Sequence, residues 1–276
     1  MPIGSGGAGG ERFPATRRSL LAAARDPDPE ARRRAWDELV ESYWRPVYKY
    51  LRWQWQEAAE EARDLTQEFF AAAFERRTLE RYEPARARFR TYLRLCLDGF
   101  VLDQRKAASR LKRGGGQALL SLDYAGAEAE LAAAGGAGFA ATRPPDPEEL
   151  FRREWVRTLF SLAIGDLRQQ CESSGWALHF EIFARYDLAA AAGSRPSYGA
   201  LAADLGLSAT QVTNHLAAAR RRLRRLVLAR LRRMTASAAE FRAEARDLLG
   251  VEVDALPAPA PADLGGDMKR AGRGDS

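Results

Sequence analysis

Short polar side chains are followed by a dense run of arginines between residues 208 and 233. Hydroxyl and amide groups of this kind can donate and accept hydrogen bonds at the edges of DNA bases, and guanidinium groups bind phosphates. No acidic residue occurs between Asp204 and Glu240, so the segment carries uncompensated positive charge. The pattern favours DNA binding over its alternative, a solvated basic surface helix. The candidate residues are Ser208, Thr210, Gln211, Thr213, Asn214, Arg220 and Arg221.

The elements that would position these residues can also be predicted. Apolar residues at helical spacing predict a short helix over 198–205, and Gly206 suits the positive φ that ends a helix. Ser208 is a good N-cap for a second helix. The inward stripe of that helix would be Val212, Leu216, Ala219, Leu223 and Leu226. Together these signals predict a helix-turn-helix whose second helix enters the major groove.

A second candidate site lies on a helix expected over residues 57–76. Asp64, Gln67 and Glu68 share one stripe of this helix, and Leu65 and Phe69 lie on the neighbouring apolar stripe. The polar stripe is either solvated or meets a basic partner, and the residues alone favour the solvated surface. No histidine or cysteine stands near these carboxylates in the sequence, so a metal site or an acid–base pair is weakly supported. Upstream, Pro46 predicts a break or kink between two helical runs.

Basic and aromatic residues alternate after Pro84. Basic groups can follow a phosphate backbone while aromatic rings stack on unpaired bases. Equally, Phe89 and Tyr92 could belong to the core beneath a solvated basic rim, and the pattern leaves both interpretations open. The candidates for contact with single-stranded nucleic acid are Phe89, Arg90, Tyr92, Arg94, Arg105 and Lys106.

Composition excludes several other classes of protein. The chain of 276 residues has a formal net charge of +6, two cysteines and two histidines. The cysteines form no CxxC pair, and His179 begins an H-x-E pattern without the PCxxC of zinc deaminases, so it is expected to be an ordinary helix residue. We expect no metal, no cofactor and no catalytic site. Without a secretory signal or a long apolar run, a cytoplasmic protein is expected.

The fold class expected is all-α, with two helical domains joined by a flexible linker. Residues 1–16 and 251–276 are predicted to be disordered because they are rich in glycine, or in proline and alanine. Residues 17–113 and 148–250 are helical in pattern, and the second contains the helix-turn-helix. Residues 114–147 are rich in glycine and alanine and end in a proline cluster, which is typical of a linker.

These motifs, in this order, resemble a bacterial RNA polymerase sigma factor of the extracytoplasmic-function (ECF) type over about residues 17–250. DLTQEFF at 64–70 is similar to the D-x-x-Q-E-x-F signature that binds core polymerase, and YGALAADLGLSATQVTNHLAAARRRL is similar to the promoter-reading helix-turn-helix. The resemblance implies a specificity subunit rather than an enzyme. Its partners would be core RNA polymerase and promoter DNA, with an anti-sigma factor or another regulator as a further candidate.

The resemblance also implies a role for each candidate residue. The β′ clamp helices would be bound by Asp64, Gln67, Glu68 and Phe69. The polar stripe would then be a protein interface and not the solvated surface that the residues alone favour. The Phe89–Lys112 stretch would help to melt and capture the −10 element, and the residues from 208 to 221 would bind the −35 element as duplex. The linker would thread toward the active-site channel of the polymerase.

Two features depart from the pattern of the family. Asp98-Gly99 stands where many members carry Arg-Asn, which puts the −10 specificity in doubt, and an extension, TASAAEFRAEARDLLG, follows the last DNA-binding helix. That extension is either a regulatory helix or a cap on the C-terminal domain. The alternatives to a sigma factor are a stand-alone, dimeric helix-turn-helix regulator, a metal-dependent nuclease using Asp64 and Glu68, and an interaction protein that binds an acidic regulator.

Overall fold

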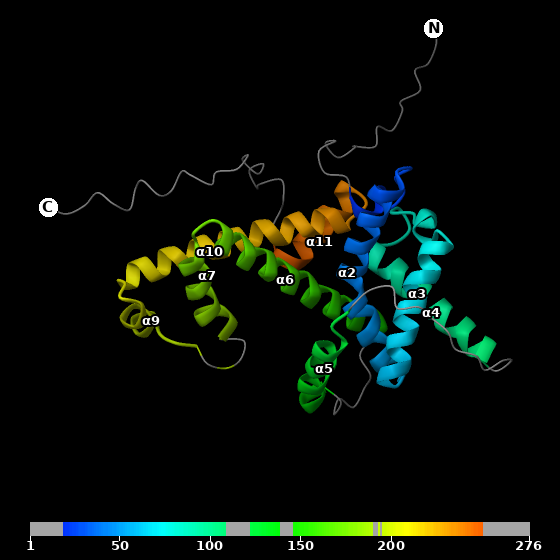
Figure 1. Ribbon diagram of the computed structural model, residues 1–276, viewed down its shortest axis with the longest axis horizontal. Coiled ribbons are helices and arrows are strands. Elements are labelled where there is room, and N and C mark those ends of the chain that lie inside the picture. Colours follow the sequence, from blue (N-terminus) through cyan, green and yellow to red (C-terminus); the bar gives the residue numbers. More distant parts are fainter. Residues whose placement is uncertain (1–18, 109–121, 139–145, 190–192, 194, 251–276) are drawn as a thin grey trace, which may run out of the picture. The chain divides into compact units, whose positions relative to one another are not determined.

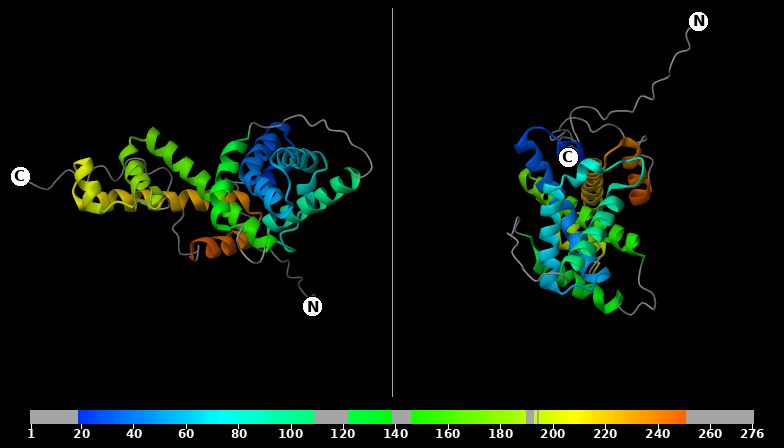
Figure 2. Two further views of the ribbon diagram at one scale, coloured as in Figure 1. Left: turned by 90° about the horizontal axis from the view of Figure 1, so that it is seen from below. Right: turned by 90° about the vertical axis from the view of Figure 1, so that its right-hand side faces the viewer.

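The computed structural model describes residues 19–108, 122–138, 146–189, 193 and 195–250. Within these ranges the regular secondary structure is helical and there is no strand (Figures 1 and 2). The all-α prediction is therefore confirmed. The predicted disordered ends, 1–16 and 251–276, lie outside the described residues.

The chain divides into two compact units, each made of discontinuous segments. Unit 1 combines residues 1–162 with 229–244, and unit 2 combines residues 163–228 with 245–276. The helices of the N-terminal part are α1 (Leu20–Ala23), α2 (Pro29–Gln54), α3 (Ala59–Glu75), the 3-10 helix η1 (Thr78–Arg81), α4 (Phe89–Ala108) and α5 (Tyr124–Gly138). They are followed by α6 (Pro147–Ser173), α7 (Ala177–Phe183), the π-helical turn η2 (Ala184–Leu188), α9 (Tyr198–Leu205), α10 (Ala209–Met234) and α11 (Ala238–Leu249).

Helix α2 starts at a well-formed cap and continues through a proline. Both carboxylate oxygens of Asp28 accept backbone N–H groups of the first turn, at 3.2 Å each, and Pro29 occupies the first helical position. The predicted break at Pro46 is wrong, because α2 is one helix from Pro29 to Gln54. Tyr43, before the proline, and Leu51, after it, are both buried, so core packing stabilises both halves. This packing offsets the loss of one backbone hydrogen bond.

The core of unit 1 lies among α2, α3, α4 and the start of α6. Helix α3 covers nearly the predicted range and buries its apolar stripe, including Leu65 and Phe70. On α4, Leu93, Leu97 and Val101 are each at most 1% exposed, as their helical spacing predicts. Edge-to-face contacts between aromatic rings join the helices, such as the one between Tyr43 and Phe89 with centroids 5.4 Å apart.

The segment predicted to be a flexible linker contains α5, so that prediction is corrected for residues 124–138. The ring of Tyr124 is buried against Trp44 and Tyr48 of α2, at centroid distances of 5.2 and 5.0 Å. Ion pairs to α2 reinforce this contact. The alanines and glutamates of α5 favour a helix, whereas the glycines within it and beside it suggested a linker.

Unit 2 has its own hydrophobic core. Helix α9 and the N-terminal half of α10 pack with α7 and the C-terminal part of α6 around this core, whose fully buried members include Leu167, Ile182 and Val212. Leu201 of α9 and Leu216 of α10 are also buried, as the predicted inward stripes require. The core thus fixes α9 and the start of α10 as one rigid pair of helices.

Candidate nucleic-acid interface

The polar stripe of α3 is partly open to solvent. Asp64 is exposed and Gln67 and Glu68 are half-buried, whereas Phe69 is only 2% exposed and contacts the rings of Phe70 and Phe100. Three of the four predicted docking residues can therefore meet a partner directly. Phe69 is a core residue that holds the stripe in place.

Three acidic side chains lie close together along this stripe, Glu61, Asp64 and Glu68. The pKa of Glu68 is raised, first by burial and then by the negative charges of Asp64 and Glu61. The Nε2 of Gln104 donates a hydrogen bond of 2.8 Å to Glu68 and fixes its carboxylate. A basic partner would relieve the repulsion among these acids.

The N-terminal part of α4 places its predicted DNA-contacting residues inside unit 1. Phe89 is 1% exposed and Arg90 is 5% exposed, and the Tyr92 hydroxyl donates to the carbonyl oxygen of Thr78 at 2.7 Å. Phe89 therefore belongs to the core, which is one of the two interpretations that the sequence left open. In this conformation its ring cannot stack on a base.

Asp98 has a structural role that its position in the sequence did not reveal. Its carboxylate accepts hydrogen bonds from the Tyr50 hydroxyl at 3.0 Å, the Trp55 indole N–H at 3.1 Å and Arg94 at 2.7 Å. Arg94 also donates to Glu148 of α6 at 3.0 Å. Asp98 and Arg94 therefore join α2, α4 and α6, which accounts for an acidic residue at this place in α4.

The C-terminal end of α4 is basic and exposed. Arg105 and Lys106 are both exposed, and Arg105 donates to the Glu57 carboxylate at 2.6 Å while its guanidinium lies 4.7 Å from the centre of the Trp55 ring. Ion pairs at an exposed surface contribute little stability and exchange readily. Both side chains reach solvent, unlike Arg90, and Arg105 would first have to leave Glu57 to bind a phosphate.

The turn between α9 and α10 has the predicted geometry. Gly206 adopts the left-handed conformation, with φ 66° and ψ 32°. At the start of α10 the Ser208 hydroxyl accepts the backbone N–H of Gln211 at 3.2 Å, and the Gln211 side chain accepts the backbone N–H of Ser208 at 2.8 Å. This reciprocal capping fixes the first turn of α10.

The first turns of α10 present their polar side chains to solvent. Thr210, Gln211, Thr213 and Asn214 are all exposed. The Thr213 hydroxyl bonds to the carbonyl oxygen of Thr210 and Gln211 is used in the cap, whereas no described residue hydrogen-bonds the Asn214 amide. Asn214 is therefore the strongest candidate for reading a base.

The arginines that follow differ in their surroundings. Arg220 makes two hydrogen bonds to the carboxylate of Asp187, at 2.8 and 2.6 Å, and this partner raises its pKa. Arg222 donates to Gln170 at 3.0 Å, and Arg221 is exposed. Arg221 can therefore reach a phosphate directly, while Arg220 would first have to leave Asp187.

Sequence reasoning missed a contact that supports α10 from behind. The two histidines of the chain meet, with Nδ1 of His215 at 3.0 Å from Nε2 of His179, and the Trp176 ring stacks on His179 at 4.3 Å. Burial and the neighbouring His215 lower the pKa of His179 to about 4. The pair thus ties α7 to α10 while both rings are neutral. Their separation of 36 residues gave no local signal.

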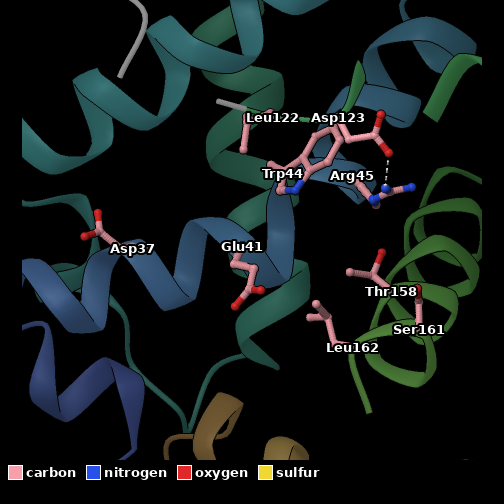
Figure 3. A pocket seen from close by; sticks show the side chains of 9 residues that line it. All are labelled: Asp37, Glu41, Trp44, Arg45, Leu122, Asp123, Thr158, Ser161 and Leu162. Atoms are coloured by element: carbon pink, nitrogen blue, oxygen red, sulfur yellow. Dashed lines mark hydrogen bonds and ion pairs between the residues drawn. The ribbon is translucent and has the colours of Figure 1, made fainter. Parts of the chain in front are cut away.

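A cavity of about 360 Å³ lies on unit 1 between α2, α6 and the residues that precede α5 (Figure 3). Asp37, Glu41 and Trp44 line one side, and Arg45 bonds to Asp123 across another. The lining contains neither histidine nor cysteine. Among the described residues there is also no cluster of three potential metal-ligating side chains.

Comparison with known proteins defines the class to which these features belong. The family model for Sigma-70 region 2 matches residues 39–111, which include the α3 stripe and α4. This part of the chain is therefore similar to region 2 of sigma-70 factors. No curated protein and no solved structure matches the chain significantly. No helix in the described ranges is long and apolar enough to cross a membrane.

Proposed function

We propose that the protein is a sigma factor of the ECF type that directs core RNA polymerase to a class of promoters. The observation that carries the proposal is the match to Sigma-70 region 2, which places the exposed acidic stripe of α3 within that region. The ECF assignment rests on the resemblance of DLTQEFF and of the α9–α10 segment, which lies outside the match. Helix-turn-helix geometry at α9 and α10 supports it.

In this proposal the two units bind different partners. Asp64, Gln67 and Glu68 contact the β′ clamp helices, and Phe69 supports them from the core. The exposed end of α4, with Arg105 and Lys106, contacts the −10 region. The first turns of α10, with Asn214 and Arg221 foremost, contact the −35 duplex through base edges and phosphates. Two modules in one chain gain affinity through their effective concentration.

Run-off transcription with purified bacterial core polymerase on a pool of templates tests the proposal. The protein should produce new, discrete start sites, and Asp64→Ala/Glu68→Ala should reduce those transcripts by about tenfold or more, because a hot spot at the interface is lost. Glu30→Ala/Glu172→Ala also removes two exposed acids, but outside this stripe, and should leave the transcripts unchanged. Equal loss in both double variants would contradict the docking role.

The second candidate function is a stand-alone helix-turn-helix regulator. It is favoured by the same α9–α10 geometry, but it leaves the exposed α3 stripe without a partner. Tight binding to a palindromic duplex without polymerase, together with no stimulated transcription, would decide for this alternative.

A further inference from the structure

Two glutamates of α11 lie against the N-terminus of α4. The carboxylate of Glu240 accepts the backbone N–H of Phe89 at 2.8 Å and the Tyr82 hydroxyl at 3.2 Å. Glu244, which is 3% exposed, forms ion pairs with Arg90 and, at 3.3 Å, with Arg88. All these residues belong to unit 1. The C-terminal extension thus fills a site on the helix that bears the predicted −10 residues.

The site has the properties of an anion-binding site. The N-terminus of a helix of 20 residues supplies backbone N–H groups and a positive dipole end. Arg90 lies in the first turn of this helix and is only 5% exposed. Its guanidinium Nε makes no hydrogen bond in the structure. A carboxylate oxygen of Glu148 of α6 lies 3.8 Å from that nitrogen. A buried guanidinium with spare donor capacity favours a ligand with several anionic oxygens.

We propose that this site binds the phosphodiester backbone of single-stranded DNA, and that α11 occupies it in the free protein. Glu240 and Glu244 stand in for two phosphate groups at the α4 N-terminus. The inference rests on the proposed function, since it assumes that α4 faces the melted −10 strand. It explains why Arg90, at the start of α4, is buried in the free protein, and it gives the extension after α10 a regulatory role.

The attachment of α11 suits a competition with a polyanion. Thr235, Ala236 and Ser237 connect it to α10, and its first turn is capped by the Ser237 hydroxyl, which accepts the Glu240 N–H at 3.1 Å. In the part of α11 that belongs to unit 1, residues 238–244, the large apolar side chain that is buried is Phe241. The contacts of Glu240 and Glu244 with Tyr82, Arg88, Phe89 and Arg90 are carboxylates on hydrogen-bond donors, which a phosphate can replace group for group.

Fluorescence anisotropy with a short, labelled single-stranded oligonucleotide of mixed sequence tests the competition on the full chain. Glu244→Gln should tighten binding by about tenfold, because the occupied state loses its main charge contact. Glu30→Gln makes the same change of net charge on an exposed side chain that pairs with Arg34 and not with the site residues, and should change binding by less than about twofold. An equal gain in both variants, or no gain in either, overturns the proposal.

Hydrogen exchange of the unsubstituted protein gives an independent test that does not depend on how a variant folds. Saturating oligonucleotide should speed the exchange of amides 238–244, since DNA displaces α11. Inorganic phosphate at the same ionic strength should leave the exchange unchanged. Unchanged or slower exchange with DNA, or no binding of DNA at low salt, overturns the proposal. Equal acceleration by phosphate would overturn the assignment to nucleic acid.

These outcomes are distinguishable from failure of the proposed function. Displacement of α11 by DNA without any stimulated transcription would leave the anion site standing and remove the sigma-factor role. Stimulated transcription without faster exchange of the α11 amides would support the sigma-factor role and overturn the displacement of α11 by DNA.

Discussion

Lys49 is a charged residue in the interior of unit 1, at 3% side-chain exposure. Its Nζ lies 2.9 Å from Glu154 of α6, which is 2% exposed, and 2.5 Å from Glu130 of α5. Removing two charges from water is costly, and their attraction compensates only when both partners are present. This arrangement makes Lys49 the residue where α2, α5 and α6 are joined.

We expect Lys49→Met to destabilise the protein by about 3 kcal/mol, because it removes the buried counter-charge of Glu154 and leaves only the exposed Arg157, at 2.6 Å. The double variant Lys49→Met/Glu154→Gln should recover part of that loss, since it also removes the buried carboxylate. Urea unfolding of both single variants, Lys49→Met and Glu154→Gln, and of the double variant measures these losses. If the double variant loses the sum of both single losses, the two groups are not coupled and the interpretation of the pair is wrong.

His179 predicts a dependence of stability on pH. Its pKa in the folded state is about 4, while the ordinary value is 6.5, so between these values the unfolded chain binds a proton that the folded chain does not. Stability should therefore fall as pH is lowered from about 6.5 toward 4. In His179→Gln this contribution is absent, and the loss between pH 7 and pH 5 should be smaller. Urea midpoints at the two pH values, measured for both proteins, check this; parallel losses would contradict it.

At the scale of elements, the turn before α10 is stabilised by local interactions, whereas the helix α5 is stabilised by contacts with a helix distant in the sequence. The turn depends on local backbone conformation and capping, which Gly206 and Ser208 supply. Helix α5 depends on contacts with a distant helix: Arg45 pairs with Asp123 and Glu130, and Arg52 pairs with Glu128 at 2.7 Å. Because several of these acids are exposed, salt should loosen α5 more than the turn.

Two glycine substitutions separate backbone strain from steric fit in unit 2. A Cβ on Gly206 meets no atom within 4 Å, but its φ of 66° is costly for alanine. Gly206→Ala should therefore destabilise by about 1 kcal/mol. Gly165, inside α6, also has open space around a Cβ and has no positive φ. Gly165→Ala should stabilise by about 0.5–1 kcal/mol. Thermal unfolding compares them, and shifts of the same sign would contradict this account.

Local signals in the sequence predicted the parts of the molecule that local physics controls. Gly206, Ser208 and the apolar stripes of α3, α4 and α10 were readable because turn chemistry and helical spacing act over a few residues. The break predicted at Pro46 is wrong because packing on both sides of it outweighs a local helix breaker, while the alternative, a kink, stays a prediction. The burial of Arg90 could not be predicted, since Glu244, its partner, lies 154 residues away in the chain. Of the candidate site residues, the structure exposes Asp64, Asn214 and Arg221 and buries Phe69, Phe89 and Arg90.

At the scale of the whole molecule, unit 1 is completed by residues from both ends of the described chain. Arg233 of α10 forms an ion pair with Glu38 of α2, and residues 229–244 are counted with the N-terminal helices rather than with unit 2. The two units therefore cannot be separated by a single cut in the chain. A fragment ending at residue 162 would lack part of unit 1, and a fragment starting at 163 would carry that part away.

The return of the chain to unit 1 has a consequence for the order of events during synthesis. A ribosome releases α2, α3 and α4 well before it releases residue 244, so contacts such as that between Phe89 and Glu240, 151 residues apart, form last. The nascent protein therefore spends a period with the start of α4 uncovered. During that period the acidic α3 stripe is outside the ribosome while the segment that completes unit 1 is still inside it.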